Sequence, residues 1–353
     1  MLIKTIEYFR LPPRWLFVKI TDEAGNAGWG EASLEGHTEA VEGCLDAFAE
    51  RFIGQEADDI EHIWQLGYRM GFYRGGPLLG GKVRDQVRVY AWIGGDRPND
   101  VESMAKGRLA AGFTAVKMNA TEDLGWLDSP NKLDACLERV KAVRSLGLDA
   151  GVDFHGRVHK PMAKQLAQLL ERERPLFIEE PLLSENVEEI RELSRQVSTP
   201  IALGERLYSR WDVKPFLEAR CVDVLQPDIA HCGGISETHR IAKMAEAYDV
   251  ALAPHCPLGP IALAASVQVD ATCANFAIQE MPLGIHYNVG GSDLTSYHKN
   301  PEVWDVKDGY IQLMSGPGLG IEIDEEAVRA ASQNIAAWRS PHFVGPGGEI
   351  REW

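Results

Sequence analysis

Hydrophobic and polar residues follow two different patterns along the chain, and the pattern changes near residue 80. In the first part, the strand-like runs WLFVKITD and AGWGEASL are joined by Glu23-Ala24-Gly25-Asn26, a composition suited to a hairpin turn. The segments EAVEGCLDAFAERFIG and DIEHIWQLGYRM then place apolar residues at three- and four-residue spacing, which predicts two amphipathic helices. We therefore predict a small α+β domain over residues 1–80, which ends near the glycine-rich turn FYRGGPLLGGK.

From Val87 onward, short apolar runs alternate with helix-like segments. The runs are VRVYAWIGG, AVKMNA, GLDAGVDFHG, PLFIEEP, PIALGER, VDVLQPD, VALAPH and NFAIQEM. Strands that alternate with helices in this number predict a parallel sheet closed into a TIM-like barrel. An open doubly wound sheet is the alternative, but it would usually carry a GxGxxG or P-loop motif, and the chain has neither. We predict an α/β barrel over residues 81–314, with the tail 315–353 packed back on the first domain.

Composition narrows the range of partners and compartments. The chain has 353 residues, 45% of them hydrophobic and 25% charged, which is typical of a globular protein. A formal charge of −16 argues against nucleic acid and against an anionic membrane surface as partners. The start MLIKTIEYFRLPPRW lacks the features of a signal peptide, and there is no run of 18 apolar residues. Six scattered cysteines without CxxC spacing fit reduced thiols, so we predict a cytoplasmic protein.

Each apolar run of the barrel is followed by a polar residue, and the intervals between these residues are nearly constant. Asp153, Glu179 and Glu205 follow one another at intervals of 26 residues. Asp228, His255 and Glu280 continue the series at intervals of 23, 27 and 25 residues. One βα unit of a barrel takes about 25–30 residues, so all these side chains are expected at the C-terminal mouth, where barrel enzymes place their chemistry.

The first members of this series are carboxylates that would repel one another and force at least one to take up a proton. A hard cation such as Mg²⁺ removes this repulsion, because it prefers oxygen ligands and keeps other positions open for water or substrate. We therefore predict Asp153, Glu179 and Glu205 as metal ligands. Ion pairs with basic neighbours such as Arg157 or Arg206 are the alternative, but they leave the even spacing unexplained.

Two histidines stand at strand ends. His255 follows the strand next to that of Asp228, and a carboxylate on one ring nitrogen fixes the tautomer and raises basicity. This arrangement predicts His255 as a general base. His155 follows a metal-ligand strand on the other side of the mouth, so we predict it as a second acid or base. His286, in GIHYN, could line the mouth, whereas the remaining histidines, including His231, are expected to be structural.

Three further polar residues are expected at the mouth. Lys117 and Asn119 point to the same face of the run AVKMNA. The lysine could neutralise a substrate carboxylate or assist the metal site, and a salt bridge at the rim is the alternative. Glu280 could hydrogen-bond a substrate carboxylate, or it could only hold a basic neighbour.

Several segments together indicate a family. They are LPPRWLFVKI, GFYRGGP, DFHGRV, PLFIEEP, GERLYSR, LQPDIAHCGGI, LAPHCPLGPIALAA and GIHYN. In these segments the chain resembles the enolase superfamily, in particular its mandelate racemase-like branch and, within that branch, the D-galactonate dehydratases. The carboxylate trio alone would indicate only the superfamily, whereas DFHGRV with LAPHCPLGP and GIHYN is specific for acid-sugar dehydratases. The resemblance implies a modified TIM barrel, (β/α)7β, with an N-terminal α+β capping domain, in a chain that forms a homo-oligomer.

The resemblance also implies roles for single residues. The Mg²⁺ ligands of the family match Asp153, Glu179 and Glu205. The base that removes the proton next to the substrate carboxylate matches His255, paired with Asp228. The acid that protonates the departing 3-hydroxyl matches His155.

Other matched residues contact the substrate in the family. Glu280 matches the group that hydrogen-bonds the developing enediolate. In the cap, Arg14, Trp15, Tyr73 and Arg74 would help to enclose the polyol. The resemblance thus implies a small-molecule acid sugar as the partner of this chain.

The reaction that the resemblance implies is the Mg²⁺-dependent dehydration of D-galactonate to 2-keto-3-deoxygalactonate. A dehydratase of gluconate or a pentonate, a racemase or epimerase, and an inactive sugar-acid-binding relative are the alternatives. Many relatives carry Lys-x-Lys where this chain has Lys117-Met118-Asn119, which argues against a racemase with a lysine base. Family members also have a longer segment, with a helix, in place of LLGGKVRD at 78–85.

Overall fold

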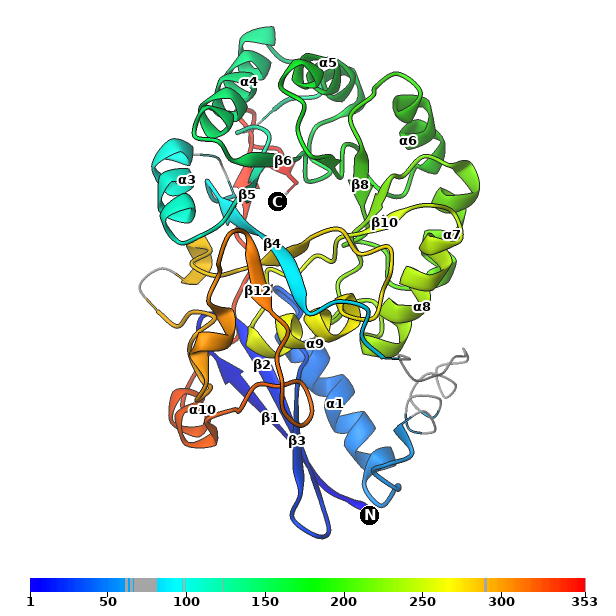
Figure 1. The fold of residues 1–353 in the computed structure, drawn as a ribbon, viewed down its shortest axis with the longest axis vertical. Helices are drawn as coiled ribbons and strands as arrows, with labels where there is room; N and C mark the ends of the chain where they lie inside the picture. Colours follow the sequence, from blue (N-terminus) through cyan, green and yellow to red (C-terminus); the bar gives the residue numbers. More distant parts are fainter. Residues whose placement is uncertain are drawn as a thin grey trace.

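The computed structural model describes residues 1–60, 63, 66, 81–96, 98, 100–122, 124–288 and 291–352 of the chain. The N-terminal part is an antiparallel sheet of β1 (Ile3–Leu11), β2 (Trp15–Asp22) and β3 (Ala27–Glu31), flanked by α1 (Thr38–Phe52) (Figure 1). The predicted hairpin is confirmed, because β2 pairs with β3 and the Asp22 carboxylate accepts the N–H groups of Ala24 and Asn26, each at 2.9 Å. The second predicted helix, DIEHIWQLGYRM, lies largely outside the described residues.

Between residues 86 and 281, the described part of the chain forms eight parallel strands that alternate with seven α-helices. The strands, in chain order and in sheet order, are β4 (Gln86–Ile93), β5 (Ala115–Asn119), β6 (Asp149–Asp153), β7 (Ile178–Glu179), β8 (Ile201–Leu203), β9 (Val224–Leu225), β10 (Ala251–Leu252) and β11 (Gln279–Met281). The helices are α3 (Val101–Ala110), α4 (Pro130–Ser145), α5 (Lys160–Leu170), α6 (Val187–Ser194), α7 (Arg210–Ala219), α8 (Gly234–Glu246) and α9 (Pro260–Asp270). β11 pairs with β4, and a bridge between Leu252 and Phe276 links β10 to the segment before β11, so the sheet closes. The predicted (β/α)7β barrel is confirmed (Figure 1).

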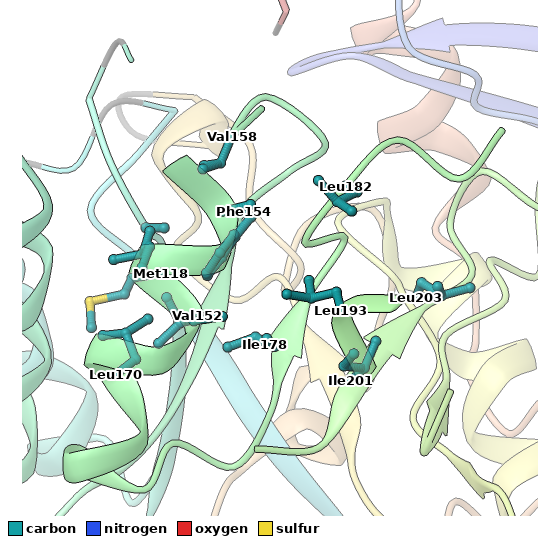
Figure 2. Close-up of a cluster of buried hydrophobic side chains, with 14 of the residues drawn as sticks. Met118, Val152, Phe154, Val158, Leu170, Ile178, Leu182, Leu193, Ile201 and Leu203 are labelled. Atoms are coloured by element: carbon teal, nitrogen blue, oxygen red, sulfur yellow. The ribbon is translucent and has the colours of Figure 1, made fainter. Parts of the chain in front are cut away.

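The barrel strands are short and apolar because both of their faces are buried. In Figure 2, Val152, Ile178 and Ile201 of three neighbouring strands pack near Leu170 and Leu193 of the surrounding helices, and each of these side chains is at most 1% exposed. Each fully buried aliphatic side chain of this size contributes about 1.5–3 kcal/mol to stability. This core holds the strand ends in fixed positions, and the polar residues that follow the strands are held with them.

After the barrel, the chain returns to the N-terminal sheet. β12 (Tyr310–Gln312) pairs antiparallel with β4, and α10 (Glu325–Ala331) contacts β1. Glu325 and Arg329 of α10 form ion pairs with Lys19 and Glu7, at 2.6 and 3.0 Å. The remaining elements are the 3-10 helices η1 (Glu171–Glu173), η2 (His286–Asn288) and η3 (Pro301–Trp304), and the strands β13 (Phe343–Val344) and β14 (Ile350–Arg351).

None of the helices within the described ranges has the length and hydropathy that are needed to cross a membrane. All six cysteines are free thiols; Cys44 is exposed and the other five are buried.

Candidate active site

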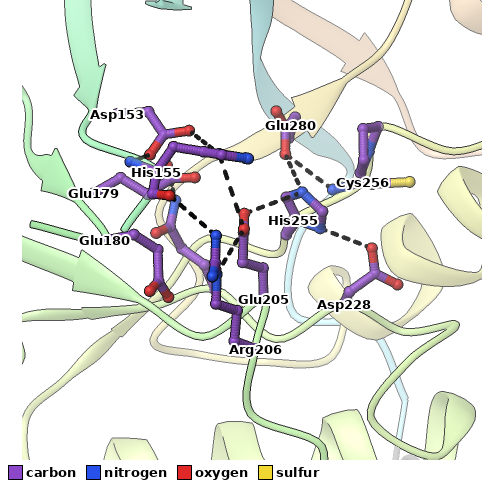
Figure 3. Close-up of polar contacts among 12 residues, drawn as sticks. Asp153, His155, Glu179, Glu180, Glu205, Arg206, Asp228, His255, Cys256 and Glu280 are labelled. Atoms are coloured by element: carbon purple, nitrogen blue, oxygen red, sulfur yellow. Dashed lines mark hydrogen bonds and ion pairs between the residues drawn. The ribbon is translucent and has the colours of Figure 1, made fainter. Parts of the chain in front are cut away.

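A pocket of about 800 Å³ lies at the C-terminal ends of the barrel strands. Side chains that follow several strands line it, among them His155, Glu205, His255 and Glu280 (Figure 3). Arg14 from the N-terminal part also lines the pocket, so the two parts of the chain enclose it together. Its volume is that of a typical site for a small molecule.

The three carboxylates predicted as metal ligands lie at adjacent strand ends. Asp153 and Glu179 are the last residues of β6 and β7 and face each other in the strand register, and Glu205 comes two residues after β8. Asp153 and Glu179 are each 1% exposed. Each carboxylate contacts a basic side chain. The distances are 3.0 Å from Asp153 Oδ2 to His155 Nδ1, 2.5 Å from Glu179 Oε1 to Lys117 Nζ, and 3.3 Å from Glu205 Oε2 to His255 Nε2.

Burial and neighbouring charges shift the pKa values of Glu179 and Glu205 in opposite directions. Burial raises the pKa of Glu179, and the negative charges of Asp153 and Glu280 add to it, so this pKa lies well above its usual value despite Lys117. For Glu205, burial also raises the pKa, but the nearby basic side chains, His255 first, bring it below the usual value. The buried Lys117 is therefore surrounded by more negative than positive charge.

The donor set fits a divalent cation. It consists of carboxylate oxygens only, which hard cations such as Mg²⁺ prefer. Glu205 Oε2 is buried and accepts no hydrogen bond from the described residues, although it lies 3.3 Å from His255 Nε2. A second group, formed by Asp228, His231 and His255, also has potential ligand atoms within 4.8 Å of one another, but its carboxylate is already bonded to an imidazole.

His255 and Asp228 form the predicted pair. Asp228 Oδ2 lies 2.8 Å from His255 Nδ1, and Asp228 Oδ1 accepts the N–H of Ala230 at 2.8 Å. A carboxylate can only accept, so Nδ1 of His255 carries the proton and Nε2 is left for the pocket. Burial lowers the pKa of His255, but the charges of Glu205 and Glu280 and the bond to Asp228 raise it to about 10. A cation bound to Glu205 would offset the charge of that carboxylate and lower this pKa, as a general base requires.

His155 has an unusual backbone conformation. Its φ is +54°, in the left-handed region that non-glycine residues rarely adopt. The backbone N–H donates to Asp153 Oδ1 at 2.6 Å, and the ring Nδ1 lies 3.0 Å from Oδ2 of the same carboxylate. Backbone strain of this kind is often found at functional sites. The conformation places the imidazole 4.0 Å from Glu205 Oε1, so the rings of His155 and His255 flank Glu205 in Figure 3.

Lys117 is a buried residue and not a rim residue. It is 1% exposed, and its Nζ lies 2.5 Å from Glu179 and 3.1 Å from Glu280. Burial lowers its pKa, but these two carboxylates raise it well above the usual value, so the ammonium stays charged. Asn119 donates from Nδ2 to the carbonyl oxygens of Gly95 and Asp96, at 3.1 and 2.9 Å, and its Oδ1 is buried without a partner among the described residues.

Of the predicted substrate contacts, Arg14 and His286 lie at the pocket, whereas Trp15 does not. Arg14 lines the pocket, and its guanidinium lies 3.9 Å from the ring centre of Tyr287. Trp15 is 2% exposed and stacks on Phe17 in the hydrophobic core of the cap. His286 lines the pocket and lies 3.2 Å from Asp96. Tyr73 and Arg74 lie outside the described residues.

Several pocket residues were missed or assigned otherwise from the sequence. Asp96 follows the first barrel strand, and the strand-end rule that identified Asp153 would have found it. His231, expected to be structural, lines the pocket, and its Nε2 lies 3.6 Å from Glu35 of the cap. Glu35 lies in a loop without periodicity and gave no signal.

Glu35 and His231 form a largely buried ion pair between cap and barrel, with side chains 12% and 10% exposed. Burial raises the pKa of Glu35, but the contact with His231 and the charge of Arg14 lower it to about 2. Burial lowers the pKa of His231, but the charges of Asp228 and Glu35 raise it to about 9. Both groups are therefore charged at neutral pH.

Comparison with known proteins identifies the family. Residues 100–327 match the family described as enolase C-terminal domain-like, and residues 12–79 match the N-terminal domain of mandelate racemase and muconate lactonizing enzyme. The D-galactonate dehydratases of Variovorax paradoxus and Cronobacter sakazakii are 44% and 45% identical to the chain over the full length of both proteins. These alignments span 383 positions, so at least 30 of them have no counterpart among the 353 residues of the chain.

Solved structures agree with this assignment. An enolase from Agrobacterium radiobacter, bound to Na and L-malate, is 30% identical, with a TM-score of 0.86 over 99% of this chain and 100% of the other. A mandelate racemase/muconate lactonizing enzyme-like protein from Rubrobacter xylanophilus is 26% identical, with a TM-score of 0.82 over 94% and 98% of the two chains. Members of this superfamily bind a divalent metal ion. The chain therefore belongs to the enolase superfamily, in the branch of the mandelate racemases and muconate lactonizing enzymes.

Proposed function

We propose that the chain is a Mg²⁺-dependent hydro-lyase that dehydrates D-galactonate to 2-keto-3-deoxygalactonate. Full-length identity of 44–45% to D-galactonate dehydratases supports the substrate. The observation that carries the reaction type is the position of two imidazoles, 4.0 and 3.3 Å from the two oxygens of Glu205. An elimination needs one group to take a proton and another to give one, and these two rings meet that need.

Asp153, Glu179 and Glu205 hold the metal ion in this proposal. When bound, Mg²⁺ supplies positive charge that stabilises the second negative charge appearing on the substrate carboxylate as the C2 proton leaves. Lys117, between Glu179 and Glu280, orients both carboxylates and adds a fixed positive charge.

His255 is the general base. Its Nε2 removes the C2 proton, and the electrons of the C2–H bond pass into the carboxylate as an enediolate. Asp228 keeps Nδ1 protonated and stabilises the imidazolium that results. General bases of this kind contribute roughly 10²–10⁴-fold to rate.

His155 is the general acid. It gives a proton to the 3-hydroxyl, the C3–O bond breaks, and water leaves as the enediolate electrons form the C2–C3 double bond. The enol product tautomerises to the 2-keto-3-deoxy acid. Glu280, which Lys117 holds at 3.1 Å, is assigned the hydrogen bond to the developing enediolate.

The remaining substrate contacts are assigned to the pocket wall. Arg14, Asn119 and His286 contact the polyol, and Trp15 supports the strand next to Arg14. Tyr73 and Arg74 stay predictions from the sequence. We further propose a cap of residues 1–80 with the tail 315–353, a barrel of residues 81–314, a cytoplasmic location and a homo-oligomeric state.

The test is a panel of acid sugars assayed for 2-keto acid formation with Mg²⁺ and with a chelator. We expect D-galactonate to be the best substrate and the chelator to abolish turnover. Preference for gluconate or a pentonate would show that this acid, and not D-galactonate, is the substrate. Exchange of the C2 proton without loss of water would instead indicate a racemase or epimerase.

A further inference from the structure

The last residues of the chain reach the pocket. Glu352 lines it together with Arg206 and His155. The charge of Glu352 also acts on His159 in the loop after β6: burial lowers the pKa of His159, and the Glu352 carboxylate acts in the opposite direction. From the sequence, the tail was expected to pack back on the cap, and its position at the pocket was not predicted.

The path of the tail to this point runs beside the cap. The ring of Trp338 meets the ring of Tyr287 edge to face, with centres 5.7 Å apart, and Tyr287 lines the pocket. Arg339 then donates to both carboxylate oxygens of Glu39 at the start of α1, at 2.6 and 2.9 Å. A Cβ atom on Gly36, whose φ is +72°, would collide with the side chain of Ser340, so the tail lies directly against this cap loop.

The final residues form a hairpin with a defined turn. Phe343 pairs with Arg351 in an antiparallel register, and the N–H of Gly345 donates to the carbonyl of Glu349 at 2.8 Å. A second bond, from the N–H of Gly348 to the carbonyl of Gly345 at 2.9 Å, closes the turn. A two-stranded hairpin is marginally stable alone, so its contacts with the rest of the molecule must hold it over the pocket.

We propose that residues 338–352 form a wall of the substrate pocket and that Glu352 selects against acids with a second carboxylate. The selectivity part rests on the proposed function. An aldonic acid brings its single carboxylate to the metal cluster and presents neutral hydroxyls to the wall. An aldaric acid of the same length would present a second negative charge near Glu352.

The neighbouring charges support this role for Glu352. Arg206 donates to the carbonyl of His155 at 3.0 Å and lies 3.6 Å from Glu205, so its charge is already directed to the barrel. Asp96 is bonded to the hydroxyl of Tyr287 at 2.6 Å. Glu352 therefore adds negative charge beside Arg206 and shields this guanidinium from a second substrate carboxylate.

The selectivity test compares Glu352→Gln with Glu349→Gln, which removes the same charge from the same hairpin away from the pocket. For each protein, kcat/KM for galactonate and the inhibition constant of galactarate are measured. In Glu352→Gln, galactarate should bind at least about threefold more tightly relative to galactonate, the factor for two unit charges roughly 6 Å apart in water. An unchanged ratio, or an equal change in Glu349→Gln, would overturn the selectivity role.

The position of the wall can be tested by a measurement that does not depend on enzyme activity. A protein that ends at Arg339 is compared with the full chain by amide hydrogen exchange. Segments 155–159 and 206–211 should exchange at least about tenfold faster without the wall, because their opening is no longer blocked. Unchanged exchange would overturn the wall. If the full chain dehydrates no aldonate, the proposed function fails, but this comparison still decides where the tail lies.

Discussion

At the floor of the pocket, Asp153, Lys117 and Glu205 come from strand ends of one barrel, with Glu179 directly beside Lys117, whereas the pocket walls come from opposite ends of the chain. The floor groups are nearly inaccessible and make short contacts with one another, such as 2.5 Å between Lys117 and Glu179. Exposed contacts hold the tail segment of the wall against the N-terminal part of the chain. One of them is the ion pair of Arg339 and Glu39, whose side chains are 70% and 43% exposed. On the proposed function, the barrel sets the chemistry and the walls set which acid is accepted. Substitutions in the floor should abolish turnover, and substitutions in the wall should change KM and selectivity.

The largest effect is expected at the proposed metal ligands. Glu205→Gln removes a ligand charge and should lower kcat/KM by more than about 10³-fold, since the cation supplies several kcal/mol of transition-state stabilisation. The midpoint of Mg²⁺ activation should rise as well, as measured by titration of activity. The control is Glu192→Gln on the exposed face of α6, which removes the same charge. Equal loss in both variants would contradict the assignment.

The next effect concerns the orientation of the base. Asp228→Asn keeps the shape but removes the carboxylate that holds His255 Nδ1 at 2.8 Å. We expect kcat to fall by about 10²–10⁴-fold, the range for a disabled general base, with KM nearly unchanged. Asp249→Asn, in an exposed turn, is the control. A rise in KM together with the fall in kcat would indicate a disturbed pocket instead of a disabled base.

A smaller effect is expected where wall and floor meet, at the ion pair of Glu35 and His231. His231 has its pKa raised to about 9, so its contribution to stability is full below pH 6.5 and is lost as pH rises through 9. Glu35 has its pKa lowered to about 2, so its contribution is present above pH 4.5 and is lost as pH falls through 2. The pair should therefore stabilise the protein most between these limits, by at most about 3 kcal/mol.

The midpoint of thermal unfolding as a function of pH measures this contribution. In His231→Asn, the thermal midpoint should fall less between pH 6.5 and 9 than it does in the unchanged protein. His342→Asn, at an exposed position, should keep the original profile. An identical decline in His231→Asn would show that the pair does not stabilise the closed arrangement.

The smallest effect is expected at the outer edge of the wall. Arg339→Ala removes a bidentate ion pair with Glu39, but exposed pairs of this kind contribute little. The thermal midpoint should stay within error, whereas the KM for the acid sugar should rise modestly. A large loss of stability would show that the wall is anchored more like the floor.

The floor could be predicted from the sequence because a barrel repeats. Each βα unit ends at the same level, so a constant interval between polar residues indicates a common location. This reasoning brought Asp153, Glu205 and His255 to one pocket and placed Glu179 beside it, and it would also have found Asp96. The fold was predictable for the same reason, since alternating apolar runs and helices permit few arrangements.

The walls could not be predicted in this way. Glu35 and Glu352 lie in a loop and a tail, whose positions depend on tertiary contacts and not on a repeat. Trp15 was expected beside Arg14 at the polyol, but successive residues of an extended chain point to opposite faces, so only one of them can face the pocket. His231 comes three residues after Asp228, and this spacing was not used as a signal.

The most direct test of the central claim follows two reactions of galactonate in D₂O with Mg²⁺, namely exchange at C2 and loss of water. His155→Asn should keep C2 exchange within about tenfold of the unchanged protein while elimination falls by about 10² or more. His255→Asn should lose both reactions. Retained exchange in His255→Asn, or an equal loss of both reactions in His155→Asn, would contradict a base and an acid on the two sides of one metal-binding cluster.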